Sequence, residues 1–503
     1  MVAERSRSIG AAYNYQNQKM ASSIKKNFAL NLINTISGLL FPLITFPYAS
    51  RILLADGIGQ VQFFQSIIDY VALFAAIGIP LYAVRETAKI RDDKQAMSKT
   101  TCEILLLHGL LTLAGYVVIL LLAAYVEKIQ VDVPLFLLLS TTLFFNAIGV
   151  PWFYQGVEDF KYITIRTILV RTFSLVCLFI FVKTKEDIMY YAAITVVANV
   201  GSNIFNFFRL RKYLDLSVLS SVKQLNLKRH LAPASRIFVL NLIISIYVNL
   251  DSVMLGFLKD EQAVGYYAAA TRLTRVILGI VTSLSGVLLP RFSNMVANGL
   301  FDEFYALAGK AISFMLAASL PMFAGLAVMA SPIISLFCGD DFAPSVLTLQ
   351  IISPIILFVS LASVLGMQIL YPLGKERFYI IATAVGAIAN FSLNLILIPK
   401  YAQYGAAFAT VVAEFMGPFM MVILGRKYFK ISFFTRRNFN YVIGTLLMLL
   451  YLYLLHIVIV DEIKYLAIGI LGSVSVYGGY LFKMQDPFVV QVISILEQVK
   501  QKR

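Results

Sequence analysis

Long apolar stretches, separated by short polar segments, follow one another through most of the chain. A transmembrane helix needs about 20 mostly apolar residues, and the stretches have roughly that length. Fourteen stretches can be counted, so the pattern predicts an all-α membrane protein with 14 transmembrane helices. The predicted spans are 28–53, 58–83, 101–125, 133–155, 162–182, 188–208, 234–257, 264–289, 308–330, 345–370, 378–399, 404–425, 438–458 and 464–483.

Two of these spans contain features that modify a plain apolar helix. Pro42 and Pro47 lie inside the first span and predict a kink, because proline removes a backbone donor and its ring clashes with the preceding turn. The aromatic run 151–154 closes the fourth span. Aromatic side chains gather where a membrane meets water, so we expect this run to act as an interface anchor.

The composition supports a polytopic membrane protein. Of the 503 residues, 59% are hydrophobic and only 14% are charged. The first 27 residues lack the apolar core of a secretory signal peptide, so we do not expect a cleaved leader. Cys102, Cys177 and Cys338 are scattered through apolar segments and predict neither a disulfide framework nor a metal site.

The basic residues are distributed unevenly between the two sides of the predicted membrane region. Of the 42 Lys and Arg residues, 31 fall in the tails and in the loops after even-numbered spans, and 7 fall in the remaining loops. The positive-inside rule then places both termini in the cytoplasm. The net charge of +15 is therefore mainly a topology signal, and no loop is large enough to be a basic nucleic-acid-binding domain.

An internal repeat divides the chain. Asn31-Leu32-Ile33 matches 241–243, and 195–199 resembles 410–414, in each case six spans apart. Because six is an even number, the two halves have the same orientation, and transporters built this way hold their site between the halves. The predicted parts are a cytoplasmic tail (1–27), an N-lobe (28–208), a basic cytoplasmic linker (209–236), a C-lobe (237–425), and two further helices with a tail (426–503).

Four arginines lie inside predicted spans and away from the last few residues at either end of a span. Arg166 and Arg171 belong to the fifth span, and Arg272 and Arg275 to the eighth. An intramembrane charge is costly and indicates a polar cavity, and the guanidinium group suits phosphate in particular. The sequence therefore predicts a cavity for an anionic cargo. Two alternatives stay open: Arg166 could extend to the cytoplasmic interface, and Arg275 could pair with an intramembrane acid.

Acidic residues also lie inside the spans. Asp69, Asp251 and Glu414 could each neutralise an arginine or bind a coupling proton or sodium ion. Glu103 begins the third span and is expected to be a solvated end. Arg85 begins a basic cytoplasmic loop, where it could receive a lipid head group or act only as a topology anchor.

Motifs of common enzymes are missing from the sequence. It contains no phosphate-binding G-x-x-x-x-G-K-[ST] loop, no H-E-x-x-H and no G-x-S-x-G. We therefore expect a transporter that is ion-driven or passive, with no cofactor other than a coupling Na⁺ or H⁺.

Several motifs resemble a known family. The spans divide as six, six and two, an aromatic-Gln-Gly connection lies at Tyr154–Gly156, and Pro372-Leu373-Gly374-Lys375 follows span 10. The run 390–399 ends in Leu-Ile-Leu-Ile-Pro and precedes Tyr404-Gly405-Ala406-Ala407. Over nearly its whole length the chain resembles the polysaccharide transporters of the multidrug/oligosaccharidyl-lipid/polysaccharide exporter superfamily, and most closely the Wzx-type flippases of O-antigen or capsule repeat units.

This resemblance implies a V-shaped bundle of two pseudo-symmetric six-helix lobes plus two C-terminal helices, with a central cavity. It implies that undecaprenyl-diphosphate-linked oligosaccharide crosses the bacterial inner membrane by alternating access, coupled to an ion gradient. Arg171, Arg272 and Arg275 would hold the diphosphate, and an intramembrane acid would carry the ion. Membrane lipids, a polysaccharide polymerase and a chain-length regulator are the implied partners.

Other functions remain as alternatives. A lipid II flippase would carry a chemically similar cargo, so arginines do not distinguish it. A multidrug/cation antiporter should have an acidic site, which the four arginines oppose. A membrane glycosyltransferase or ligase would meet the same lipid-linked sugar, but such enzymes carry large outer loops, and the outer loops here are short.

Overall fold

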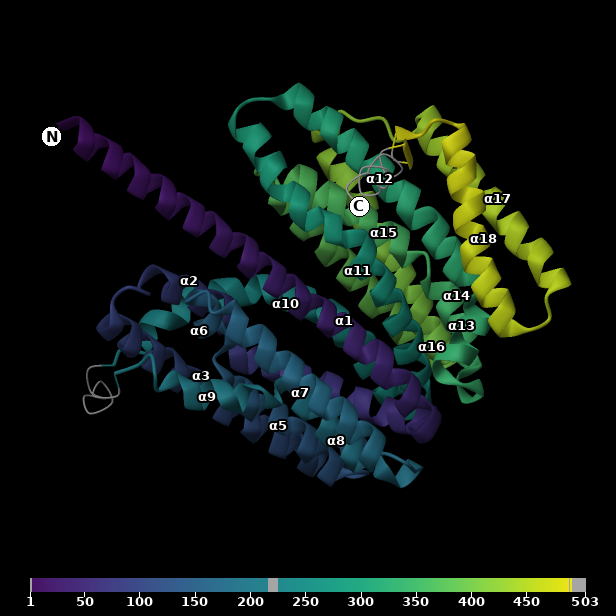
Figure 1. The fold of residues 1–503 in the computed structure, drawn as a ribbon. Coiled ribbons are helices and arrows are strands. Elements are labelled where there is room, and N and C mark those ends of the chain that lie inside the picture. Colours follow the sequence, from purple (N-terminus) through teal and green to yellow (C-terminus); the bar gives the residue numbers. More distant parts are fainter. Residues whose placement is uncertain (1, 216–224, 488, 491–503) are drawn as a thin grey trace. The chain divides into compact units, whose positions relative to one another are not determined.

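The computed structural model describes residues 2–215, 225–487 and 489–490, and these residues form helices and no strand. Figure 1 shows their order along the chain. The helices are α1 (Val2–Ala76), α2 (Ile79–Lys89), α3 (Lys94–Tyr125), α4 (Glu127–Gln130), α5 (Val133–Gly149), α6 (Pro151–Gly156), α7 (Phe160–Phe181), α8 (Ile188–Val196), α9 (Asn203–Leu210), α10 (Lys228–Leu258), α11 (Glu261–Ala297), α12 (Phe301–Val328), α13 (Ala330–Cys338), α14 (Pro344–Ile352), α15 (Ile355–Ala362), α16 (Glu376–Gly425), α17 (Arg436–Val458) and α18 (Glu462–Lys483).

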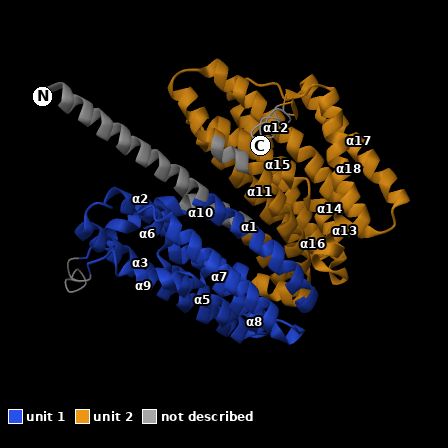
Figure 2. Cartoon of the chain, viewed as in Figure 1, with its two compact units in different colours: residues 1–53, 64–245 blue, residues 54–63, 246–503 orange. Residues whose placement is uncertain are grey.

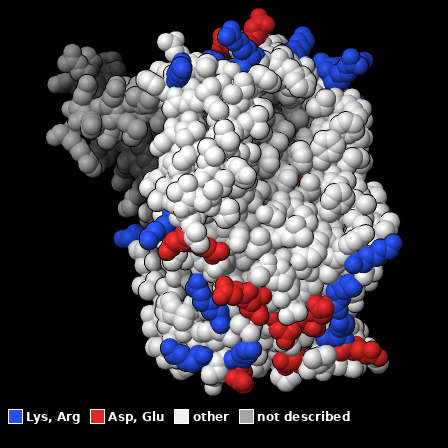
Figure 3. Space-filling view, turned by 90° about the vertical axis from the view of Figure 1, so that its right-hand side faces the viewer, with Lys and Arg blue, Asp and Glu red and all other residues white. Residues whose placement is uncertain are grey.

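The predicted all-α membrane class is confirmed. Within the described ranges, ten helical runs are long and apolar enough to cross a membrane. Two of these runs contain a sharp break, at Leu54 in α1 and at Ala402 in α16, and each covers two of the predicted spans. The total of 14 spans stays a prediction. On the face drawn in Figure 3, charged side chains gather at two levels, and a broad, largely uncharged band lies between them.

The helices divide into two compact units, coloured separately in Figure 2. Unit 1 consists of residues 1–53 and 64–245, and unit 2 of residues 54–63 and 246–503. The boundary at residues 245 and 246 lies within α10, and a ten-residue piece of α1 belongs to unit 2.

Aspartate side chains begin several helices. Asp93 accepts hydrogen bonds from the backbone N–H groups of Gln95 and Ala96, both at 3.0 Å, at the start of α3. Asp260 and Asp461 cap α11 and α18 in the same way, each at 2.8 Å. Such caps satisfy backbone donors that the first helical turn leaves without partners. Acidic residues in the loops therefore fix where helices start.

The core of unit 1 contains the aromatic run 151–154. Trp152 is 2% exposed, and Phe153 and Tyr154 are completely buried. The Tyr154 hydroxyl donates a 2.7 Å hydrogen bond to the carbonyl oxygen of Asn206 on α9. The expectation of an interface anchor was wrong, because the short helix α6 turns these rings inward, against α2 and α7.

The piece of α1 within unit 2 packs on α11 through two glycines. A Cβ atom added to Gly59 would lie 1.6 Å from the carbonyl oxygen of Glu261, and one added to Gly265 would lie 2.0 Å from that of Ala55. The backbone N–H of Ala55 also donates a 2.8 Å hydrogen bond to Asp341. Only glycine allows two backbones to approach this closely, which explains why residues 54–63 belong to unit 2.

Candidate functional site

Arg171 on α7 is a half-buried cation within the apolar region of unit 1. Its Nη1 donates to Ser37 Oγ at 2.5 Å and to the carbonyl oxygen of Asn34 at 3.3 Å, both on α1. The Arg171 guanidinium also lies close to Gly38, where a Cβ atom would be 3.5 Å from Nη2. Among the described residues Arg171 forms no ion pair, so neutral groups alone hold this charge.

Arg166 on the same helix points toward α9 instead of α1. Its side chain is buried, with 8% exposure, and its Nη1 donates a 3.2 Å hydrogen bond to the carbonyl oxygen of Ser202. Because its side chain is buried, Arg166 does not extend to water at the cytoplasmic interface. Arg166 and Arg171 are five residues apart and face different neighbours, as expected for a helix with 3.6 residues per turn.

The two arginines of α11 lie in unit 2. Arg272 is half-buried, and its Nη2 lies 3.5 Å from Gln62 Oε1 in the piece 54–63. Arg275 is exposed. Residues three apart share one helix face, so both guanidinium groups lie along the same side of α11.

Asp251 on α10 is the centre of a buried polar cluster in unit 2. It is 4% exposed, and its Oδ1 accepts hydrogen bonds from Asn394 Nδ2 at 2.6 Å and Asn390 Nδ2 at 3.1 Å. Its Oδ2 lies 2.7 Å from Thr410 Oγ1 and accepts a short hydrogen bond from the Tyr267 hydroxyl. These partners come from α11 and from both halves of α16, on either side of the break at Ala402.

The cluster surrounds one carboxylate with amide N–H and hydroxyl donors. No ion pair joins Asp251 to a basic side chain within the described part of the chain. Asn394 Oδ1 is buried and has no hydrogen-bond partner. Carboxylate and amide oxygens are ligands that hard cations prefer, so Asp251 and the Asn394 oxygen are the atoms of the cluster that could bind a small cation. Ion binding by Asp251 stays a prediction.

The other predicted site residues lie on α1, α2 and α16. Asp69 is half-buried and accepts a 2.8 Å hydrogen bond from Gln65 one turn earlier. Glu414 is half-buried on α16. Arg85 is exposed on α2 and lies 3.2 Å from Glu86, which is a surface pair of little energetic weight.

Glu103 corrects an expectation. Its side chain is completely buried, whereas the sequence predicted a solvated helix end. It forms an ion pair with Arg229, lies 2.9 Å from His230 Nε2 and accepts a 2.9 Å hydrogen bond from the backbone N–H of Asn226. The prediction was wrong because the chain before and at the start of α10 lies over α3. Burial lowers the pKa of His230 and the nearby Arg229 charge acts in the same direction, while the bond to Glu103 opposes them.

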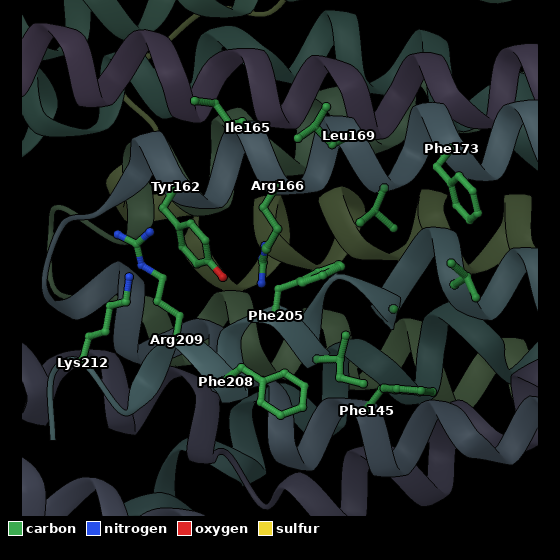
Figure 4. Close-up of a pocket in the computed structure, with 14 residues that line it drawn as sticks. Phe145, Tyr162, Ile165, Arg166, Leu169, Phe173, Phe205, Phe208, Arg209 and Lys212 are labelled. Carbon is green, nitrogen blue, oxygen red and sulfur yellow. The ribbon is translucent and has the colours of Figure 1, made fainter.

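An apolar groove of about 970 Å³ lies in unit 1 between α5, α7 and α9 (Figure 4). Aromatic and aliphatic side chains form most of its wall, and Tyr162, Arg166, Arg209 and Lys212 lie toward one end. Of these four residues, only Arg166 was predicted from the sequence as a site residue. The spacing of four between Tyr162 and Arg166, and of three between Arg209 and Lys212, could have indicated that each pair shares a helix face.

Comparison with known proteins gives a consistent set of relatives. A family model described as "Polysaccharide biosynthesis protein" matches residues 24–296. A protein named "Putative O-antigen transporter", from Escherichia coli (strain K12), is 26% identical over 410 residues, which are 80% of this chain and 97% of the relative.

Two solved structures share the fold. A lipid II flippase MurJ in an inward closed conformation has a TM-score of 0.72 at 18% identity, with 93% of this chain and 100% of that chain covered. An inward-facing multidrug resistance MATE family transporter of the MOP superfamily has a TM-score of 0.64 at 13% identity, with 77% and 93% covered. At these identities the two structures establish the architecture and not the cargo.

Proposed function

The chain belongs to the polysaccharide biosynthesis protein family, and from this premise we infer that it is a flippase for lipid-linked oligosaccharide. The match to the E. coli relative carries the conclusion, because it extends over 97% of that protein. The protein is a multi-pass membrane transporter and not an enzyme. Lipid II flippases and MATE antiporters share its fold, but the similarity to them gives neither alternative better support.

The finer assignment of the cargo follows from the charges in the membrane region. We propose that the cargo is an O-antigen, capsule or exopolysaccharide repeat unit on undecaprenyl diphosphate, moved across a bacterial inner membrane with both chain termini in the cytoplasm. Arg171 supports this proposal, because neutral groups alone hold its guanidinium within the apolar region. A permanent charge of this kind suits a phosphate ligand.

Arg272 and Arg275 extend the proposed cargo-binding set in unit 2, and Arg85 and Arg166 extend it in unit 1. Each guanidinium can donate two parallel hydrogen bonds to phosphate oxygens. The binding should differ between alternating conformations, because a ligand shifts a conformational equilibrium only by its differential affinity for the two states. A polymerase and a chain-length regulator stay proposed partners.

We propose that Asp251 binds the coupling ion. The Asp251 carboxylate supplies one negative charge, and the amide nitrogens of Asn390 and Asn394 and the hydroxyl of Thr410 donate hydrogen bonds that hold it in place. The orphaned Asn394 Oδ1 supports this role, because a buried acceptor without a partner costs free energy that a cation could recover. Asp69 and Glu414 remain secondary candidates for the same task.

Translocation in vesicles tests the function. Purified protein is placed in vesicles with a defined lipid-diphosphate oligosaccharide, and outward movement is followed by the access of an added glycosidase to the sugar. Arg171→Gln should lower the initial rate by about tenfold, since a hydrogen bond to a charged group contributes on the order of 1.5–3 kcal/mol. Lys161→Gln, an exposed cation on the same helix, is the matched control.

The outcomes separate the function from the residue assignment. Translocation by wild type and by Lys161→Gln, together with a loss in Arg171→Gln, supports both proposals. Equal rates in all three proteins would remove Arg171 from the cargo site and leave the function intact. No translocation by folded wild-type protein, under any imposed proton or sodium gradient, would overturn the flippase assignment.

A further inference from the structure

The groove between α5, α7 and α9 carries a set of buried donors that lack acceptors. Arg166 Nε, Arg209 Nε and the Tyr162 hydroxyl are each buried and have no hydrogen-bond partner within the described part of the chain. The three residues line the same groove, and Figure 4 shows Arg166 projecting into it beside the Tyr162 ring. Buried polar groups in proteins are almost always satisfied, so three such donors in one place indicate a ligand rich in acceptors.

The same donors are held together as a group. The guanidinium carbon of Arg209 lies 4.0 Å from the centre of the Tyr162 ring, and that of Arg166 lies 5.6 Å from it. Arg166 itself is more than nine-tenths buried, and its only described hydrogen bond is to the carbonyl oxygen of Ser202. The cationic end of the groove is therefore organised by the fold and not by chance contacts of surface side chains.

The cationic end of the groove carries more positive than negative charge. None of the fourteen lining residues is acidic, and three of them are basic. Arg209 is already paired with Asp159 at 2.8 Å, whereas Arg166 and Lys212 form no ion pair among the described residues, so their charges are left to a ligand. Two positive charges complement a diphosphate diester, which carries two negative charges, better than the phosphate of a glycerophospholipid, which carries one.

The rest of the groove is apolar and open. Its wall includes Leu169, Phe173, Phe205 and Phe208, which are between 54% and 64% exposed. These side chains lie on two candidate membrane spans, where exposed apolar groups contact hydrocarbon, and they continue from the cationic end along α7 and α9. One end of the groove therefore suits a phosphate group, and the rest of the groove suits an apolar hydrocarbon chain.

We propose that this groove binds the isoprenoid diphosphate end of the cargo, with the diphosphate at Arg166 and Lys212 and the isoprenoid chain along the aromatic wall. The inference rests on the proposed flippase function and assigns to unit 1 a lipid-anchor site of its own. Tyr162 and Arg209 complete the donor set. Because Arg209, Lys212 and the beginning of α7 belong to the end predicted to be cytoplasmic, the groove receives the lipid on the side where the cargo is made.

Photolabelling tests the proposal without transport. Full-length protein in nanodiscs of phosphatidylcholine is irradiated with a farnesyl diphosphate analogue that carries a diazirine at the isoprenoid end, and labelled peptides are identified by mass spectrometry. Labels should fall on α7 and α9, and unlabelled farnesyl diphosphate should prevent them. Lys212→Gln and Arg166→Gln should each reduce labelling by about tenfold, as expected for the loss of one charged contact.

Two controls keep the test specific. Lys161→Gln removes an exposed cation outside the groove and should label like wild type. Lys212 is exposed, so its substitution is not expected to disturb folding, whereas Arg166 is buried. Labelling that is absent from α7 and α9, or unchanged in Lys212→Gln, would overturn the proposal. Labelling prevented by phosphatidylglycerol as well as by farnesyl diphosphate would also overturn it, because the groove would then be a phospholipid site.

The failure of this proposal is distinguishable from failure of the flippase function. The same Lys212→Gln protein is assayed for translocation in vesicles. Normal translocation together with unchanged photolabelling would reject the groove and retain the function. Specific labelling of the groove together with reduced translocation in Lys212→Gln supports the groove as part of the cargo's route.

Discussion

Substitution of Gly59 by alanine should destabilise unit 2 far more than an ordinary glycine-to-alanine change. Gly59 lies in the piece of α1 that packs on the first turn of α11. Its new Cβ atom would be 1.6 Å from the carbonyl oxygen of Glu261 and 2.7 Å from the backbone nitrogen of Gly265. Both neighbours are backbone atoms within a helix, so neither can rotate away.

The magnitude follows from the movement that the new methyl group requires. The Cβ–oxygen distance must rise from 1.6 Å to at least 3.0 Å, which separates two helices along their contact. Overpacking of this kind costs about 3 kcal/mol, and the better helix propensity of alanine returns about 1 kcal/mol. The expected loss is about 2 kcal/mol, which corresponds to a fall in Tm of roughly 4–8 °C for a unit of this size.

Gly417→Ala provides the matched control. Gly417 is also a buried helical glycine of unit 2, but a Cβ atom there would meet nothing within 4 Å. This substitution should raise Tm by roughly 2–4 °C, because it changes helix propensity alone.

The assay uses the one cysteine of unit 2. Cys338 is 1% exposed at the end of α13, so a thiol-reactive fluorescent dye reports its exposure on heating when Cys102 and Cys177 are replaced by alanine. If Gly59→Ala melts at the wild-type temperature, the close approach of the two backbones does not exist as described. An equal fall in Tm for Gly59→Ala and Gly417→Ala would also refute the reasoning, because the steric clash at Gly59 alone should separate the two variants.

Two further predictions concern buried ionisable groups. Asp251→Asn should abolish any rise in Tm that sodium or acidification produces in wild-type protein, because the only carboxylate of the polar cluster is gone; a rise retained in the variant would exclude Asp251 from ion binding. His230 has a pKa held below its ordinary value mainly by burial, so acidification below about pH 6.5 protonates the unfolded chain before the folded one and lowers stability. His230→Gln should flatten the decline of Tm between pH 7 and pH 5, and an unchanged slope would contradict this account.

The membrane class could be predicted because long apolar stretches have few alternative structures. The breaks near residue 54 and residue 402 were also predictable, since polar and small residues separate adjacent spans there. The inward turn of Trp152 and its neighbours was not predictable, because an aromatic run at a span end is equally compatible with an interface and with a core.

The candidate sites could also be predicted only in part. Asp251 stood out in the sequence as an acid within a span, but its partners Asn390, Asn394 and Thr410 come from a distant helix. Helical spacing predicts which side of its own helix a residue occupies, and it does not say which other helix lies against that side. The buried ion pair of Glu103 was missed for this reason, since Arg229 is far along the chain and lies within the predicted basic linker.

The basic connection between α9 and α10 has a consequence for how the protein responds to proteolysis. Its two described ends both belong to unit 1: the backbone N–H of Asp215 donates to Ser98 Oγ at 2.8 Å, and that of Asn226 donates to Glu103. A nick between them would leave both new termini tethered to α3. The severed polypeptide should therefore migrate as one particle in mild detergent and fall into two fragments only when denatured.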